Sequence, residues 1–302
     1  MVRSVVVGFD GSAESRAAAE WAAREAKRRG LSVKLVHVWE TVPEPLALAR
    51  FLGAETRQPW GGRVARAVVE GLRARHPGLD VTVEQVAGRP AEVLAEAVKD
   101  AELVVLGSRG LSGIGGFLVG SVGQAVVAGA EQQPVVLVRA GERAADGHAV
   151  DPSGLPSSAA LSGPVVLGLD TDHPDDTVIA YAFEAAARRV TPLRVVHAWS
   201  PPPYFVYGLP ADPELNAVLG KQDAATLAEV LHRWKEEYPA VQVVEESRCG
   251  SPAVELVDAS RGASLVVVGR RIRRSPLGAR IGPVTHAVLH HAPAPVAVIA
   301  HD

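Results

Sequence analysis

The chain has little of what several protein classes require. A single cysteine among 302 residues excludes a disulfide framework within the chain and fits a reducing compartment. No apolar run reaches the roughly 18 residues that a membrane-spanning helix needs. The N-terminus enters a strand-like apolar run too early for a signal peptide. We therefore expect a cytoplasmic protein that has no membrane partner.

The chain also lacks an excess of positive charge and the common catalytic motifs. The formal net charge is −3, so no basic excess offsets a nucleic-acid backbone, and nucleic acid is not an expected partner. The sequence lacks Gly-x4-Gly-Lys-Ser/Thr, His-Glu-x2-His and Gly-x-Ser-x-Gly. No nucleophile–base pair stands out. We therefore predict no catalytic residue and no protein metal site.

Five segments of the first half of the chain recur in the same order in the second half. The pairs are Val5–Asp10 with Val165–Asp170, Leu35–Trp39 with Arg194–Trp199, Gly88–Ala91 with Gly250–Ala253, Leu103–Gly107 with Leu265–Gly269, and Pro134–Val138 with Pro295–Ile299. Residues 141–163 are rich in Gly, Ala, Ser, Pro and Asp, as in a flexible linker. The sequence thus predicts a tandem duplication, with domains at 1–140 and 164–302.

Short apolar segments alternate with helix-like segments in the first copy. The predicted strands are 3–9, 32–38, 80–86, 103–107 and 134–139, and the predicted helices are 12–29, 63–75, 90–100 and 121–131. This alternation is typical of an α/β fold, in which a parallel sheet is covered by helices on both faces. We predict two tandem doubly wound domains, each with five parallel strands. Ligands of such sheets bind beyond the carboxyl ends of the strands.

The most informative motif is a glycine-rich segment that follows the fourth predicted strand. It reads Gly107-Ser108-Arg109-Gly110, and nine residues later Gly120-Ser121 begins a predicted helix. Unpaired N–H groups and the helix dipole favour an anion at a helix start. Glycine lets the backbone approach a ligand, and Ser121 adds a hydroxyl at the predicted cap position. The spacing therefore indicates a phosphate-binding loop, and a nucleotide is the first ligand to consider.

Together with Gly8-Phe9-Asp10-Gly11-Ser12, Val36-His37-Val38 and the closing Pro134–Val138, this spacing resembles the universal stress protein family in its tandem-domain form. The resemblance implies a Rossmann-like, adenine nucleotide alpha hydrolase-like fold that binds ATP, with Mg²⁺ as a candidate companion. It places Asp10 near the ribose and any metal, Val38 at the adenine, and Gly120 at the phosphates. The implied set is Gly8, Asp10, Val38, Gly107, Ser108, Arg109, Gly110, Gly120, Ser121 and Val122. Asp10 and Ser121 have a plainer alternative as helix caps.

The second copy departs from this motif. Ile272 stands where the first copy has Gly110, and Pro283 stands where it has Ser121. Isoleucine disfavours positive φ, and proline removes an N–H and the hydroxyl. The neighbouring arginines supply donors that pair with phosphate. A solvated basic loop, an anionic nucleotide site, and a contact with nucleic acid or protein all stay open. The second candidate set is Asp170, Ala198, Gly269, Arg270, Arg271 and Gly282.

Three functions remain in competition. The first is a regulatory, stress-response protein that binds ATP and hydrolyses it slowly at most. The second is an ATPase or a nucleotidyl or phosphoryl transferase, which is disfavoured because Arg109 is the sole obvious cation of the first loop. The third is a protein-interaction module that binds no nucleotide. We also expect Val135–Val138 and Val296–Ile299 to pair as a pseudo-dimer within one chain, with a homodimer and an unidentified protein partner left open.

Overall fold

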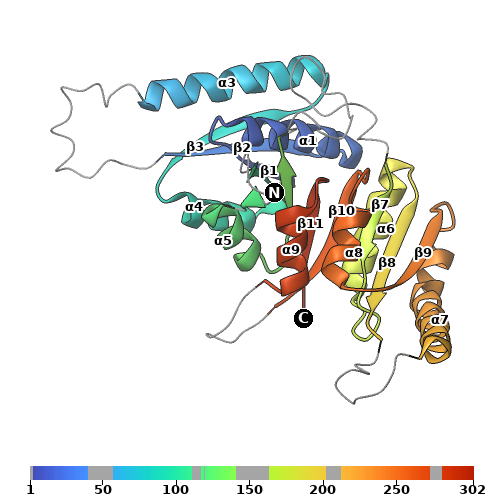
Figure 1. Ribbon diagram of the computed structural model, residues 1–302. Coiled ribbons are helices and arrows are strands. Elements are labelled where there is room, and N and C mark those ends of the chain that lie inside the picture. Colours follow the sequence, from blue (N-terminus) through green and yellow to red (C-terminus); the bar gives the residue numbers. More distant parts are fainter. Residues whose placement is uncertain are drawn as a thin grey trace. The chain divides into compact units, whose positions relative to one another are not determined.

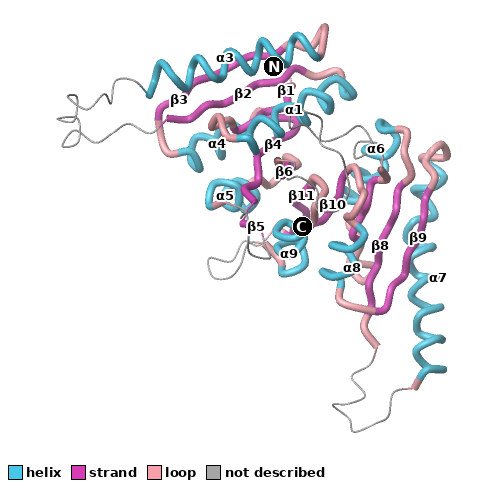
Figure 2. The backbone as a smooth tube through the Cα atoms, turned by 45° about the horizontal axis from the view of Figure 1, so that its top comes forward, coloured by secondary structure: helices cyan, strands magenta, loops and turns pink. Residues whose placement is uncertain are grey.

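The chain forms two compact units, Met1–Ser157 and Ser158–Asp302, each an α/β sandwich (Figure 1). The computed structural model describes residues 3–39, 57–110, 117–118, 120–140, 163–201, 212–272 and 281–302. Each unit has one five-stranded parallel sheet with helices on both faces, seen as magenta strands flanked by cyan helices in Figure 2. The predicted fold class is therefore confirmed.

The sheet of unit 1 has the strand order β3-β2-β1-β4-β6, all parallel. Its strands are β1 (Ser4–Gly8), β2 (Ser32–Trp39), β3 (Val81–Ala87), β4 (Ala101–Gly110) and β6 (Val135–Arg139), and the two-residue β5 (Phe117–Leu118) pairs antiparallel with the end of β4. Its helices are α1 (Ala13–Arg29), α3 (Arg57–Arg75), α4 (Pro90–Val98) and α5 (Ser121–Gly129). Helices α1 and α3 contact each other on one face, and α4 and α5 contact each other on the opposite face.

The sheet of unit 2 repeats this arrangement in the order β9-β8-β7-β10-β11. Its strands are β7 (Val165–Gly168), β8 (Leu193–Trp199), β9 (Val243–Cys249), β10 (Leu265–Arg271) and β11 (Val296–His301). Its helices are α6 (Asp176–Arg189), α7 (Pro213–Glu237), α8 (Pro252–Ala259) and α9 (Pro283–His291). In each unit the strand order reverses beside the first strand, between β1 and β4 and between β7 and β10. A reversal of this kind opens a crevice at the carboxyl ends of the strands.

The central strands form the core of each sheet. Val5 and Val7 in β1 and Val104 and Val105 in β4 are fully buried. Such continuous apolar strands are expected where helices cover both faces of a parallel sheet. Burial of these side chains is the main source of free energy that holds the strand ends, and hence any ligand site there, in place.

A buried carboxylate ties helix α3 to helix α1. Glu20 in α1 is 4% exposed. Its Oε2 accepts hydrogen bonds from Nε and Nη2 of Arg75 at 3.1 and 3.0 Å, and its Oε1 lies 2.8 Å from Nε2 of His76. Burial raises the pKa of Glu20, but the hydrogen bonds and charges of His76 and Arg75 outweigh it and leave that pKa below its usual value. The carboxylate is therefore ionised and held from two sides.

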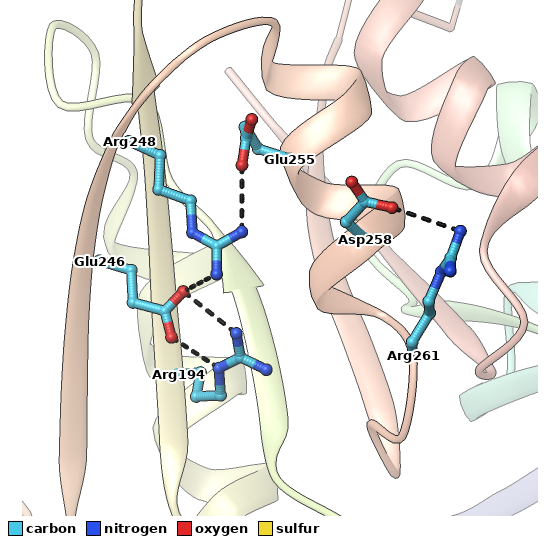
Figure 3. Close-up of polar contacts among 6 residues, drawn as sticks. All are labelled: Arg194, Glu246, Arg248, Glu255, Asp258 and Arg261. Atoms are coloured by element: carbon cyan, nitrogen blue, oxygen red, sulfur yellow. Dashed lines mark hydrogen bonds and ion pairs between the residues drawn. The ribbon is translucent and has the colours of Figure 1, made fainter.

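Unit 2 has a larger ion-pair network, which joins β8, β9 and α8 (Figure 3). Arg194 donates to both carboxylate oxygens of Glu246, at 2.7 and 3.1 Å. Arg248 bridges Glu246 and Glu255, at 2.5 and 3.0 Å. The hydrogen bond from Arg194 is the first cause that lowers the pKa of Glu246. The network fixes the first turn of α8 against the end of β9.

Most predicted boundaries agree with the structure within two residues, but three features differ. Helix α3 begins at Arg57 rather than 63, since the low helix propensity of Gly61-Gly62 concealed its start. Strand β4 extends to Gly110, because its end pairs with β6 and β5. Strand β5 itself was not predicted. None of the helices in the described ranges combines the length and apolar character needed to cross a bilayer.

Candidate functional site

A cavity of about 400 Å³ lies at the crevice of unit 1. It is bordered by the carboxyl ends of β1, β2 and β4 and by the first turns of α1, α4 and α5. The lining residues are Gly8, Phe9, Asp10, Ser12, Glu14, Ser15, Val36, Val38, Pro90, Leu94, Leu106, Gly107, Gly120, Ser121, Val122 and Gly123. Seven residues of the first predicted set are among them. They are Gly8, Asp10, Val38, Gly107, Gly120, Ser121 and Val122.

The N-terminus of α5 faces this cavity. Gly120 is its N-cap residue, with φ −59° and ψ 159°, and as a glycine it provides no side-chain cap to the helix start. The first intrahelical N–H bond is that of Gln124, which reaches the carbonyl of Gly120 at 3.0 Å. The amides of the preceding residues Ser121 to Gly123 therefore have no partner within the helix. Ser121 is the first helical residue and not the cap as predicted, so its side chain is not used in capping.

Two motif glycines at this cavity serve different purposes. A Cβ on Gly107 would lie 2.6 Å from the carbonyl carbon of Glu14 and 2.8 Å from the nitrogen of Ser15. Glycine is therefore required here so that α1 can pack against β4. A Cβ on Gly120 would meet no atom within 4 Å. The small size of Gly120 leaves the cavity open in front of the α5 amides. The small size of Gly107 instead allows the close packing of α1 on β4.

Asp10 has a fixed position at the mouth of the cavity. Its Oδ1 accepts hydrogen bonds from the backbone nitrogen and the hydroxyl of Ser12, at 3.0 and 2.5 Å. The Ser12 hydroxyl in turn accepts the Ser15 N–H at 3.1 Å and caps α1. Asp10 thus supports the cap without being the cap, and it remains exposed. The carboxylate therefore lines the cavity while it supports the start of α1.

Of the three remaining predicted residues of unit 1, only Ser108 can be placed relative to the cavity. Residues Gly107–Gly110 are the end of β4 and not a free loop. Ser108 is 2% exposed and does not line the cavity, because side chains alternate across a strand. This corrects the inclusion of its side chain in the candidate set. The side chain of Arg109 and the surroundings of Gly110 lie outside the described residues.

The cavity of unit 1 is acidic in the part that the structure describes. Asp10 and Glu14 line it, and among the described residues no lysine or arginine does. Sequence reasoning missed Glu14, whose place in the first turn of α1 was the available signal. Within the described ranges no group of three or more His, Cys, Asp or Glu residues is arranged to hold a metal ion. A cation at this site would therefore need oxygen ligands from the bound molecule as well.

Unit 2 has a corresponding cavity of about 440 Å³. Five members of the second predicted set line it, namely Asp170, Ala198, Gly269, Arg271 and Gly282. The sixth, Arg270, is 4% exposed and lies off the cavity, because β10 turns its side chain to the opposite face from Arg271. The expectation that Arg270 supplies a donor to this site is therefore corrected.

Three histidines and a further aspartate also line the cavity of unit 2: His173, His197, His301 and Asp175. None of these three histidines is among the predicted site residues. His301 is the last residue of β11 and His173 precedes α6, so no local sequence signal connects them. Their convergence depends on the order of strands in the sheet.

Comparison with known proteins agrees with the duplication. Residues 1–139 and again 162–300 match the universal stress protein family. A universal stress protein of Mycobacterium tuberculosis is 37% identical over 302 residues, which cover 97% of this chain and 96% of that protein. Another, from Mycolicibacterium smegmatis, is 31% identical and covers 98% and 96%.

A solved structure shares the fold along the whole chain. The crystal structure of a universal stress protein from Archaeoglobus fulgidus matches with a TM-score of 0.64 at 17% identity, and covers 99% of this chain and 98% of that one. The sequence matches extend over both units. This protein therefore belongs to the universal stress protein family.

Proposed function

We propose that unit 1 binds ATP and that the protein acts as a nucleotide-responsive regulator in a stress response. The observation that carries the proposal is the uncapped start of α5 at Gly120, which faces a cavity at the strand-order reversal. Three amides in that position form an anion site. Val38 at the end of β2 borders the same cavity and is the proposed adenine contact.

The charge of the cavity favours a metal complex of ATP over the free nucleotide. A triphosphate next to Asp10 and Glu14 would be repelled, since no lysine or arginine lines the described part of the cavity. A Mg²⁺ ion removes this repulsion when it is bound by the Asp10 carboxylate and by phosphate oxygens, which are the ligands that Mg²⁺ prefers. The residues present thus fit Mg²⁺·ATP.

The same charge distribution supports a regulatory role over an enzymatic one. Phosphoryl transfer is accelerated by cations that stabilise charge on the transferred group. The described cavity offers carboxylates and backbone amides, so the account predicts slow hydrolysis at most. An ATPase or transferase remains the alternative, and it would require a cation from Arg109 or another segment outside the described residues.

The test is calorimetric titration of the full chain with Mg²⁺·ATP, for the wild type and for Gly120→Val. Valine at 120 fills the space before the α5 amides without meeting an atom at its Cβ. We expect the affinity of the unit 1 site to fall by at least about tenfold. Gly282→Val is the matched control, because Gly282 is also an N-cap with open space at its Cβ. It should leave this site unchanged.

The absence of ATP binding by the wild type, or equal binding by Gly120→Val, would contradict the proposal. Circular dichroism of both variants checks that the fold is kept. Cytoplasmic location, a homodimer, the pairing of the last strand of each copy and a protein partner stay predictions. Light scattering of the purified chain tests the homodimer.

A further inference from the structure

The cavity of unit 2 differs from that of unit 1 in its charged groups. Unit 1 presents two carboxylates and, in its described part, no basic side chain. Unit 2 presents an arginine and three histidines together with two aspartates: Arg271, His173, His197, His301, Asp170 and Asp175. The two cavities occupy equivalent places in the fold. Because their charged groups differ, their ligands need not be held by the same chemistry.

Both aspartates of this cavity are engaged by histidines. Oδ2 of Asp170 lies 3.6 Å from Nδ1 of His173. Oδ2 of Asp175 lies 3.7 Å from Nδ1 of His301, and its Oδ1 accepts the amides that begin α6. An imidazole thus lies beside each carboxylate, whereas no histidine lines the described part of the cavity of unit 1.

Arg271 is differently placed. It is exposed at the end of β10, borders the cavity, and makes no ion pair within the described residues. A guanidinium has five N–H donors in a planar fork that matches a phosphate group. Arg271 is thus a cation at the cavity, and no carboxylate of the described residues forms an ion pair with it.

The surroundings of Gly269 show how the cavity of unit 2 differs from its counterpart. A Cβ on Gly269 would lie 2.8 Å from Nε2 of His301, whereas one on Gly107 would meet the backbone of α1. Helix α1 begins three residues after Asp10, but α6 begins six residues after Asp170. His173 lies in the longer connection, and His301 packs against the motif glycine. Histidines thus border this cavity where the start of a helix borders the other.

The start of α9 offers fewer amides than that of α5. Pro283 occupies its first position and has no N–H. The hydroxyl of Thr285 is already used, since it donates to the carbonyl of Gly269 at 2.8 Å. The amides of Val284 and Thr285 remain at the helix start. In unit 2 a side-chain cation therefore has to donate the hydrogen bonds for which unit 1 has the N–H and the hydroxyl of Ser121.

We infer that unit 2 binds a small phosphate monoester without a divalent metal ion, with Arg271 as the principal phosphate ligand. The amides of Val284 and Thr285 complete the phosphate contacts, and His173 and His301 form the polar wall. The inference stands whether or not unit 1 binds ATP, because it rests on residues of unit 2 alone. Together with the proposed function of unit 1, it predicts one metal-dependent and one metal-independent site in the same chain.

The experiment is titration of Gly120→Val with AMP, adenosine and inorganic phosphate in the presence of EDTA. The background variant removes the unit 1 site, and EDTA removes divalent metal. We expect AMP to bind at least about tenfold more tightly than adenosine, and inorganic phosphate to compete with it. Introducing Arg271→Gln should abolish the preference for AMP.

The matched control is Arg261→Gln. Arg261 is an exposed arginine of the same unit that pairs with Asp258 at 3.5 Å and lies off the cavity (Figure 3). The Arg261→Gln control should bind AMP as tightly as the Gly120→Val background variant does. Absence of AMP and phosphate binding in EDTA, or equal binding by Arg271→Gln, would overturn the inference. Titration of Arg271→Gln alone with Mg²⁺·ATP reports on unit 1, so failure of one site is distinguishable from failure of the other.

Discussion

The ring nitrogen Nδ1 of His37 lies 2.9 Å from the carbonyl oxygen of Phe9. The same contact recurs in unit 2, where Nδ1 of His197 lies 3.1 Å from the carbonyl oxygen of Leu169. Since a carbonyl only accepts, Nδ1 carries the proton in both rings. Each bond joins the residue that follows the first strand of its sheet to the second strand, at the edge of the cavity. This geometry indicates a structural role for both histidines.

Replacement of His37 by phenylalanine should destabilise the protein. The change keeps an aromatic ring but removes the donor to the Phe9 carbonyl, and loss of a half-buried hydrogen bond of this kind costs about 0.5–1.5 kcal/mol. Urea unfolding of His37→Phe measures this loss. His232→Phe is the control, because His232 is exposed on α7 and should change the stability by less than about 0.5 kcal/mol. Equal effects of the two variants would contradict the assigned role.

Replacement of Val190 by glycine should stabilise unit 2. Val190 ends α6 with φ 51° and ψ 51°, a left-handed conformation that β-branched residues disfavour, and it is 93% exposed. Gly30 ends α1 in the same way, with φ 66°. We expect Val190→Gly to gain about 1 kcal/mol and Gly30→Val to lose about that much. Thermal unfolding checks both. A lower melting temperature for Val190→Gly would show that the strain is absent.

The contact between α1 and α3 should weaken in acid. The pKa of Glu20 is lowered in the folded state, so its charge stabilises the fold above the unfolded pKa of about 4.3. This stabilisation is lost as the pH falls from that value through the lower folded pKa. Urea unfolding between pH 7 and 3 should therefore show a smaller loss for Glu20→Gln than for the wild type. Parallel pH profiles would refute this prediction.

The two motif glycines should separate stability from binding. Gly107→Ala places a Cβ against the backbone of Glu14 and Ser15, and we expect a loss of about 1–3 kcal/mol. Gly120→Ala meets no atom and should change stability by less than about 1 kcal/mol. Chemical denaturation of both variants makes the comparison. A larger loss at Gly120 than at Gly107 would mean that their roles are misassigned.

The duplicated fold could be predicted because its signal is local. Buried parallel strands such as Val5–Val7 and Val104–Val105 are continuous apolar runs, and helix starts such as Ser12 have recognisable caps. The order of elements follows from these signals, whereas the seven cavity residues of unit 1 are implied by the family resemblance of the motifs. The strand end at Gly107–Gly110 was missed because glycine and serine are poor strand formers, and its strand conformation comes from pairing with β6 and β5.

The rest of the site could not be predicted because it depends on tertiary contacts. The burial of Ser108 and Arg270 follows from the face to which each strand turns them. The approach of His301 to Asp175 needs β11 to lie beside β10 and α6 to begin late. These contacts join residues far apart in the sequence.

The most direct test of the account is a crystal structure of the full chain grown with an excess of Mg²⁺ and ATP. The account predicts a triphosphate at the amides of Ser121 and Val122, Mg²⁺ beside Asp10, and adenine at Val38. A cavity in unit 1 that stays empty under these conditions, or ATP bound elsewhere on the chain, would contradict it.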